Sequence, residues 1–101
     1  MGIEMIWSCG IWTLREGRDA EFADAWREFA QWSQTEFGGA RAWLLRDRAA
    51  ARTYMTVGPW PDEQTIEAWR SSPGFRDRVG AIRSLVEAFE PRTYDEVTSV
   101  G

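Results

Sequence analysis

Apolar and polar residues follow two different periods along this chain, and the changes between them divide it into elements. Residues 3–14 carry Ile, Trp and Met with no helical period, which predicts a strand that ends at the polar turn 15–18. From Asp19, the expected N-cap, a helix is predicted to run to a C-cap at Gly38-Gly39. Helical spacing relates its core-facing positions, which are Phe22, Ala25, Trp26, Phe29, Trp32, Ser33 and Phe37.

Two short strands and a broken helix are predicted for the rest of the chain. The strands cover residues 40–46 and 52–57 and should pair antiparallel across a short loop. Asp62 is expected to cap a helix that runs to about Ser71 with Ile66 and Trp69 on its buried side, and Ser72–Pro73 restarts it. The restarted helix should continue until Pro91, on the apolar positions Phe75, Val79, Ile82, Leu85, Val86 and Phe89. Residues 92–97 are expected to form a last strand.

The resulting order, β-α-β-β-α-β with a broken second helix, predicts an α+β fold of the ferredoxin-like type with an antiparallel sheet. A chain of 101 residues has room for one domain, residues 1–101. Helices in this topology cover one face of the sheet, yet the first strand is apolar on both faces, where Met5, Trp7, Cys9 and Ile11 alternate with Ile6, Trp12 and Leu14. The uncovered face predicts a homodimer in which two sheets pack together.

Composition removes several classes of partner and chemistry. Sixteen acidic and 12 basic residues give a net charge of −4, which argues against nucleic acid or an anionic membrane surface as partner. No apolar run approaches the roughly 18 residues of a membrane span. The single Cys9 and the lack of a signal-like start favour the reducing cytoplasm. With no His in the chain, catalysis by Ser/His/Asp or Cys/His groups is excluded.

Several segments resemble the dimeric α+β barrel proteins of the antibiotic biosynthesis monooxygenase family. The similar segments are residues 11–22, the sequence Phe37-Gly38-Gly39, the sequence Gly58-Pro59-Trp60 and, most specifically, the stretch Ala68-Trp69-Arg70-Ser71-Ser72-Pro73-Gly74-Phe75-Arg76. The last of these resembles the family's Trp-bearing broken helix. The resemblance implies a dimeric barrel fold. It leaves the activity open among quinol monooxygenases, haem-degrading enzymes and members without a known reaction.

Within this family the resemblance favours the branch that works without a cofactor. The haem-degrading branch places a haem-ligating His and an Asn at about the positions of Val79 and Gly10 here. Cys9 is a poor substitute as a thiolate ligand, and no carboxylate pair has a facial-triad partner, so neither haem nor another metal is expected. The resemblance then implies a monooxygenase that activates an aromatic or polyketide-like quinol or anthrone in a dry pocket. A non-catalytic protein that binds a hydrophobic metabolite or assists a partner enzyme, and a cyclase or isomerase, remain as alternatives.

Three residues are candidates for the chemistry. Trp69 matches the family's helix Trp and is expected to line the pocket, although a Trp on such a helix also serves as core. Thr65 stands one turn earlier, where some quinol-oxidising relatives carry an Asn, and keeps one hydrogen-bonding group. Tyr54 either exchanges a proton with the substrate oxygen or packs with a satisfied hydroxyl.

Four further residues are candidates for substrate binding. Ser8, Gly10 and Trp12 share one face of the first strand. The small residues at positions 8 and 10 leave space for a pocket, or Gly10 marks a β-bulge. Arg76 either binds an anionic group of the substrate or lies in solvent.

Overall fold

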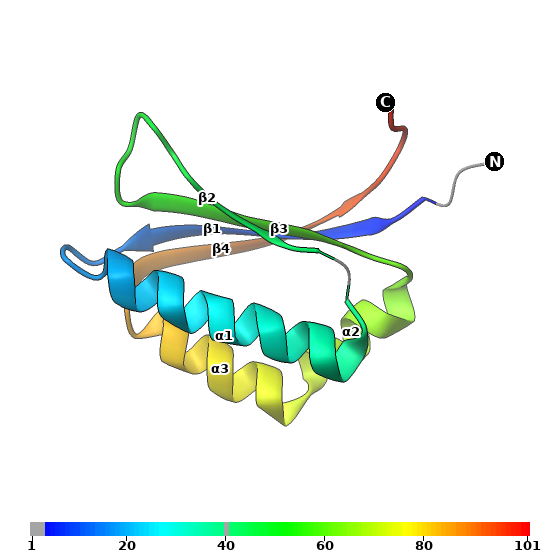
Figure 1. Cartoon of the computed structure of the whole chain (residues 1–101), viewed down its shortest axis with the longest axis horizontal. Helices are drawn as coiled ribbons and strands as arrows, with labels where there is room; N and C mark the ends of the chain where they lie inside the picture. The colour runs from blue at the N-terminus through cyan, green and yellow to red at the C-terminus, as the bar shows by residue number, and fades with distance from the viewer. Residues whose placement is uncertain (1–3, 40) are drawn as a thin grey trace.

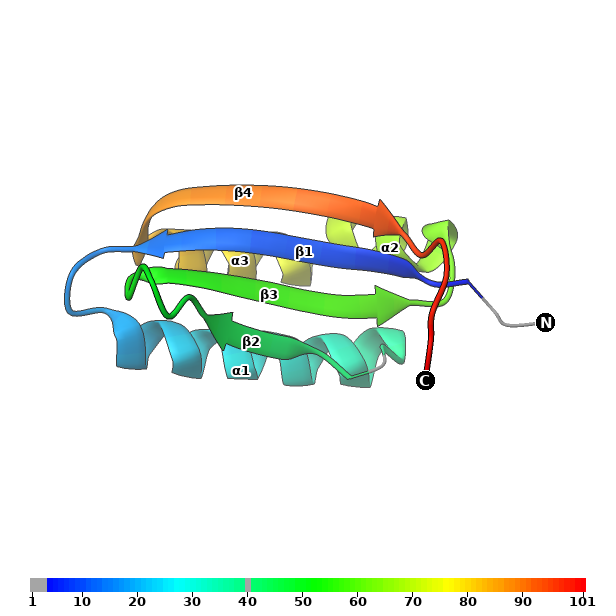
Figure 2. The same ribbon diagram turned by 90° about the horizontal axis from the view of Figure 1, so that it is seen from above.

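Four strands form one antiparallel sheet, and helices cover one of its two faces (Figures 1 and 2). The computed structural model describes residues 4–39 and 41–101. Along the chain the elements are β1 (Ile6–Leu14), α1 (Asp19–Phe37), β2 (Trp43–Arg46), β3 (Thr53–Trp60), α2 (Glu63–Ser71), α3 (Pro73–Arg83) and β4 (Val86–Asp95). The strands lie side by side in the order β2-β3-β1-β4. The α+β ferredoxin-like class with its broken second helix is therefore confirmed.

The core fills the space between the sheet and the helices. Trp12 and Leu14 point to the helices from β1, and Phe22 of α1 and Ile82 of α3 meet them with at most 3% of their surface exposed. Burying a side chain of this size contributes about 1.5–3 kcal/mol, so this layer supplies much of the stability. None of the helices in the described ranges is long and apolar enough to cross a membrane.

The caps that the sequence predicts for the helices after β3 are confirmed. The Asp62 carboxylate accepts a hydrogen bond from the backbone N–H of Thr65 at 2.7 Å. Ser72 separates α2 from α3, and its hydroxyl accepts from the backbone N–H of Phe75 at 3.2 Å, with Pro73 at the first helical position. The break brings the rings of Trp69 and Phe75 edge to face, with centroids 4.8 Å apart.

The start of α1 differs from the prediction. Arg18 occupies the cap position, but its side chain does not cap the helix, and Asp19 is the first helical residue. The Asp19 carboxylate instead accepts a hydrogen bond from the Tyr54 hydroxyl at 2.7 Å. An acidic side chain in the first turn still interacts favourably with the helix dipole. At the other end Gly38 is the predicted C-cap, with a left-handed φ of 64°.

The last helix is shorter, and the last strand longer, than predicted. The helix ends at Arg83, and β4 begins at Val86. Leu14 pairs with Val86 and Thr13 with Ala88, so Glu87 is an extra residue in a β-bulge. The bulge allows Val86 and Phe89, three residues apart, to lie opposite Leu14 and Trp12 on one face. That spacing imitates a helix, which explains why the prediction for residues 86–89 is wrong.

The limits of two other strands also shift. β2 begins at Trp43 rather than residue 40, while Ile3 and Ala40, the predicted first residues of two strands, lie outside the described residues. β3 continues beyond Val57 to Trp60 and includes Pro59. The pairing of β2 with β3 covers Tyr54–Val57 and ends before Pro59, where a missing N–H is tolerated.

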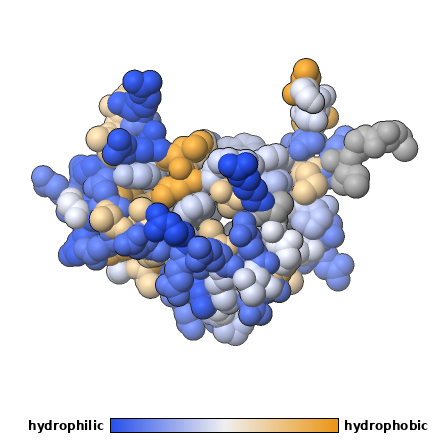
Figure 3. Space-filling view, viewed as in Figure 1, coloured by the Kyte–Doolittle hydropathy of each residue, from blue (hydrophilic) through white to orange (hydrophobic). Residues whose placement is uncertain are grey.

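The second face of the sheet carries apolar side chains that no helix covers. Trp7, Cys9 and Ile11 of β1 lie beside Pro59, Val57 and Met55 of β3, and Trp43 and Leu45 of β2 extend this open face. Leu45 is 48% exposed and Met55 is 37% exposed. Figure 3 shows a hydrophobic patch at the level of the sheet, whereas the surface below it, over the helices, is largely hydrophilic. The two-sided apolarity predicted for the first strand is thus present in the structure.

Candidate functional site

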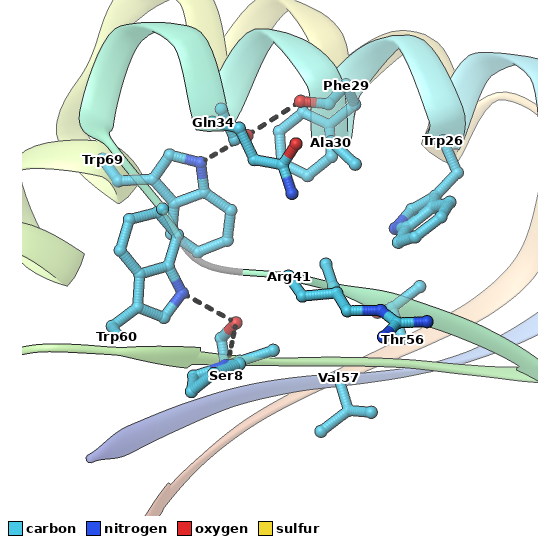
Figure 4. A pocket seen from close by; sticks show the side chains of 15 residues that line it. Ser8, Trp26, Phe29, Ala30, Gln34, Arg41, Thr56, Val57, Trp60 and Trp69 are labelled. Carbon is cyan, nitrogen blue, oxygen red and sulfur yellow. Dashed lines mark hydrogen bonds between the residues drawn. The ribbon is translucent and has the colours of Figure 1, made fainter.

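A cavity with two lobes lies between the helices and the sheet, and Figure 4 shows the residues that line one of these lobes, the β3 lobe. The β3 lobe extends toward Gly58, Pro59 and Trp60, and the β4 lobe extends toward Phe89 and Pro91. Each lobe has a volume of about 60 Å³. The two lobes adjoin, because they share the lining residues Ser8, Trp26, Phe29, Thr56 and Trp69.

Hydroxyl groups hold three of the indole rings at the cavity in place. Each pair consists of an indole N–H that donates to the oxygen of a Ser or Thr side chain. The pairs are Trp60 with Ser8 at 3.1 Å, Trp12 with Thr56 at 3.0 Å and Trp69 with Ser33 at 2.8 Å. Buried indole N–H groups normally find such a partner, and these contacts fix the ring orientations. A fourth indole, that of Trp26, lines both lobes and makes no side-chain hydrogen bond within the described part of the chain.

The three hydroxyls differ in whether their own proton is available for a hydrogen bond to a ligand. Ser33 donates its own proton to the Phe29 carbonyl at 2.8 Å, and Ser8 has a long contact of 3.5 Å to the Gly58 carbonyl. Thr56 accepts from Trp12, but its own hydroxyl proton has no acceptor among residues 4–39 and 41–101. Thr56 lines both lobes. Among the three hydroxyls, the Thr56 O–H is therefore the donor best placed to bind an oxygen atom inside the cavity.

Strand alternation and register bring these groups together. Ser8, Gly10 and Trp12 alternate onto the helix-facing side of β1, and Gly10 lies opposite Thr56. A Cβ atom at Gly10 would lie 2.8 Å from Trp12 Nε1 and 2.9 Å from Thr56 Oγ1. The absence of a side chain at position 10 thus permits the indole–hydroxyl contact. The register of β1 is regular at Gly10, so the alternative interpretation as a β-bulge is wrong.

Four of the predicted site residues line the cavity. Trp69 and Ser8 border both lobes, and Gly10 and Trp12 border the β4 lobe. Trp69 comes from α2, and its ring packs against Trp60 with centroids 4.5 Å apart. In Figure 4 these two rings stand together at one end of the cavity, and Trp26 approaches from the other end.

The other three predicted residues lie elsewhere. The Tyr54 hydroxyl is bound to Asp19, and the Tyr54 ring packs on Phe22, away from both lobes. Burial, the largest cause, and the Asp19 carboxylate raise the pKa of Tyr54. Arg46 lowers this pKa by a smaller amount. Thr65 belongs to the capped first turn of α2, where its hydroxyl donates to Asp62 at 2.8 Å. Arg76 is exposed on α3 and borders neither lobe. Tyr54 and Thr65 therefore do not meet Trp69 at the cavity.

The charged side chains that line the lobes are both cations. Arg41 borders the β3 lobe, with its guanidinium 5.4 Å from the centre of the Trp43 ring, and Arg70 borders the β4 lobe. No carboxylate lines either lobe in the described part of the chain. The Cys9 side chain alternates onto the open face, and burial raises the pKa of its thiol. The cavity thus offers hydrogen-bond donors and positive charge to a ligand.

Sequence reasoning misses Thr56, Trp26 and Arg70. Thr56 shares the helix-facing side of β3 with Tyr54, so the face is predictable, but only the register shows which of the two lies opposite Gly10. Trp26 is predicted as core, and it does pack against the core cluster while also lining both lobes. Arg70 follows Trp69 directly and therefore points about 100° away from it around the helix, toward β4.

Comparisons with known proteins agree with this architecture. A variant of SnoaB from Streptomyces nogalater, a cofactor-independent oxygenase, has a TM-score of 0.87 at 22% identity and covers 98% of both chains. A conserved protein from Methanosarcina mazei has a TM-score of 0.82 at 13% identity, over 91% of this chain and 92% of its own. A search of curated proteins finds no match. The sequence profile described as "Antibiotic biosynthesis monooxygenase" matches residues 10–81, and the chain therefore belongs to the antibiotic biosynthesis monooxygenase family.

Proposed function

We propose that this protein is a cofactor-independent monooxygenase that acts on an electron-rich aromatic compound, a quinol or an anthrone. The observation that carries the proposal is the aromatic cavity, in which fixed indoles surround the available hydroxyl donor of Thr56. Membership of the family and the similar fold of SnoaB, a cofactor-independent oxygenase, support it. Trp69, Ser8, Gly10 and Trp12 are the site residues that we retain from the sequence prediction.

The reaction needs an oxidisable substrate and O2. For an anthrone, the ring methylene carbon gains one oxygen atom as a carbonyl, and its two hydrogens leave with the other oxygen atom as water. The negative charge that develops on the substrate oxygen during this oxidation needs a hydrogen-bond donor in a site with little water. Thr56 supplies that donor, and the indoles of Trp12, Trp60 and Trp69 exclude water around it.

The size of the cavity sets a condition on this function. Pockets that enclose drug-sized ligands have about 300–1,000 Å³, whereas each lobe has about 60 Å³. A substrate must therefore displace a lining side chain. Trp26 is the candidate, because it lies where the lobes meet and lacks the hydroxyl partner that holds Trp12, Trp60 and Trp69. Its displacement joins the two lobes into one cavity.

A homodimer belongs to the same proposal. The open face of Trp7, Ile11, Trp43, Met55 and their neighbours is apolar and uncovered, and a second copy placed sheet to sheet would bury it. Light scattering should then give twice the chain mass of 11.6 kDa. Met55→Glu should shift the protein toward monomer, while Ala81→Glu on the exposed side of α3 should leave the dimer intact.

Oxygen uptake with a panel of hydroquinones and anthrones tests the activity. Uptake with a product that has gained one oxygen atom supports the oxygenase. A product of unchanged mass indicates a cyclase or isomerase, and binding without any product indicates a metabolite-binding or accessory protein. Trp69→Phe should weaken substrate binding, whereas Trp32→Phe, the same change on α1 outside both lobes, should leave it unchanged. Equal kinetics in both variants would refute the assignment of the cavity.

A further inference from the structure

Arg70 closes one end of the β4 lobe without a carboxylate partner. Its guanidinium crosses from α2 to β4 and donates to the Thr93 hydroxyl at 2.7 Å. The ion pairs between described residues involve Arg18, Arg27, Arg52 and Arg92, and none includes Arg70. Burial lowers the pKa of Arg70, and no neighbouring carboxylate offsets this effect. An arginine nevertheless stays charged at neutral pH, so the lobe borders a partly desolvated cation.

The remainder of the described lining adds hydrogen-bond donors and no carboxylate. The β4 lobe is lined mainly by aromatic and small side chains, with Thr56 as its hydroxyl donor. Acidic residues outnumber basic ones by 16 to 12 in the chain, yet neither lobe has an acidic side chain in its described lining. A cation in an apolar cavity attracts an anion more strongly than it would in water. The charged side chains that line the cavity are therefore positive, although the whole protein has a net negative charge.

We propose that the ligand of this cavity is an aromatic oxyanion whose charged oxygen is bound by Arg70 at the β4 end, with its ring among the indoles. The inference rests on the proposed function, because it assigns a substrate class to the same cavity. Arg70, rather than the predicted Arg76, is then the residue that recognises an anionic group. Arg76 is exposed on α3, outside both lobes.

Benzoate and benzamide are matched probes for this site, since they differ in charge and hardly in shape. Titration calorimetry in a buffer free of carboxylate and phosphate ions should show benzoate binding about 10- to 100-fold more tightly than benzamide. Arg70→Gln should remove this preference, and it should weaken benzamide binding much less than benzoate binding. Arg70→Lys should keep part of it. Arg83→Gln is the matched control, because it removes the same charge from a residue that borders neither lobe.

Equal binding of the two probes to the unmodified protein would overturn the proposal without any variant. A preference for benzoate that persists in Arg70→Gln, or that falls equally in Arg83→Gln, would also overturn it. The probes undergo no oxidation, so the result is independent of turnover. Anion binding through Arg70 with no oxygen uptake would refute the oxygenase alone, and uptake without a role for Arg70 would refute the anion site alone.

Discussion

Thr56→Val and Ser33→Ala together separate a structural hydroxyl from a functional one. Each substitution removes the oxygen that accepts an indole N–H, from Trp12 in the first case and Trp69 in the second. Trp12 is 3% exposed and Trp69 is 8% exposed, so each variant leaves a buried donor without a partner. Such a loss costs about 1–3 kcal/mol. In Ser33→Ala a few tenths of a kcal/mol return, because Ala favours the helix more than Ser does.

The two variants should therefore lose similar stability and differ in activity. Only Thr56 has a hydroxyl proton available to the ligand, since the Ser33 proton is bound by the Phe29 carbonyl. Removing one donor to a developing oxyanion lowers turnover by about 100- to 1,000-fold. We expect a loss of this size in Thr56→Val and a loss of less than about tenfold in Ser33→Ala.

Urea unfolding and oxygen uptake measure the two effects. Unfolding must be compared at one protein concentration, because the stability of a dimer depends on concentration. Turnover is measured at saturating substrate, so that weaker binding does not lower the rate. If both variants lose turnover equally, the effect follows from loosened indoles, and Thr56 has no direct role. If neither loses turnover, the cavity is not the site of the reaction.

Four further predictions concern the cavity and the elements around it. Gly10→Ala should destabilise the protein by about 1–3 kcal/mol in urea unfolding, because the added Cβ would lie within 3 Å of Trp12 and Thr56. Trp26→Ala should raise kcat/KM for three-ring substrates more than for one-ring substrates, and an equal change for both would contradict its role at the junction of the lobes. Tyr54→Phe should leave turnover intact. Burial and Asp19 raise the pKa of Tyr54, so the protonated Tyr54 hydroxyl stabilises the folded protein below about pH 10, and this contribution is lost as the pH rises further. The free energy of unfolding of Tyr54→Phe should therefore fall less steeply with pH in the alkaline range. Hydrogen bonds from Thr65 lower the pKa of Asp62, so the contribution of the Asp62 carboxylate to stability is present above about pH 4 and is lost on acidification. Asp62→Asn should keep the cap, and the free energy of unfolding of this variant should fall less steeply as the pH is lowered.

Helix boundaries proved predictable where they depend on residues close in sequence. Asp62 with Thr65, and Ser72 with Phe75, form caps across three residues, and each is readable from the sequence. The role of Asp19 depends instead on Tyr54, 35 residues away. The Tyr54 hydroxyl donates a hydrogen bond to the Asp19 carboxylate, which is therefore not the cap of α1. A local pattern contains no information on that competition.

The start of β4 shows a second kind of limit. Val86 and Phe89 have helical spacing, and the bulge at Glu87 makes that spacing compatible with a strand. The bulge forms where β1 pairs with β4, between Thr13 and Leu14. Because the irregularity belongs to a pair of strands distant in sequence, the apolar pattern of one strand could not predict it.

The sequence could predict which side of each helix or strand faces the candidate site. It could not predict the register in which β1 pairs with β3. Trp69 follows from the buried side of α2, and Ser8 with Gly10 follows from the alternation along β1. On β3, Tyr54 and Thr56 have the same orientation but lie about 7 Å apart along the strand. Pairing with β1 places Tyr54 opposite Trp12 and Thr56 opposite Gly10. Tyr54 then reaches Asp19 at the start of α1, whereas Thr56 faces the cavity.

The register of β1 also connects the cavity to the proposed dimer. Its even-numbered residues, Ser8 and Gly10 among them, face the helices and the cavity, whereas the side chains of Cys9 and Ile11 alternate onto the open face. A slip of one residue would exchange the two sets, bringing Cys9 and Ile11 under the helices and exposing Trp12. In the proposed dimer, a second copy on the open face would oppose such a slip, because the slip would lose the apolar contacts of Ile11. The proposed assembly would therefore be coupled to the shape of the cavity through one strand. We expect a monomeric variant to bind ligand less tightly even though no cavity residue has changed.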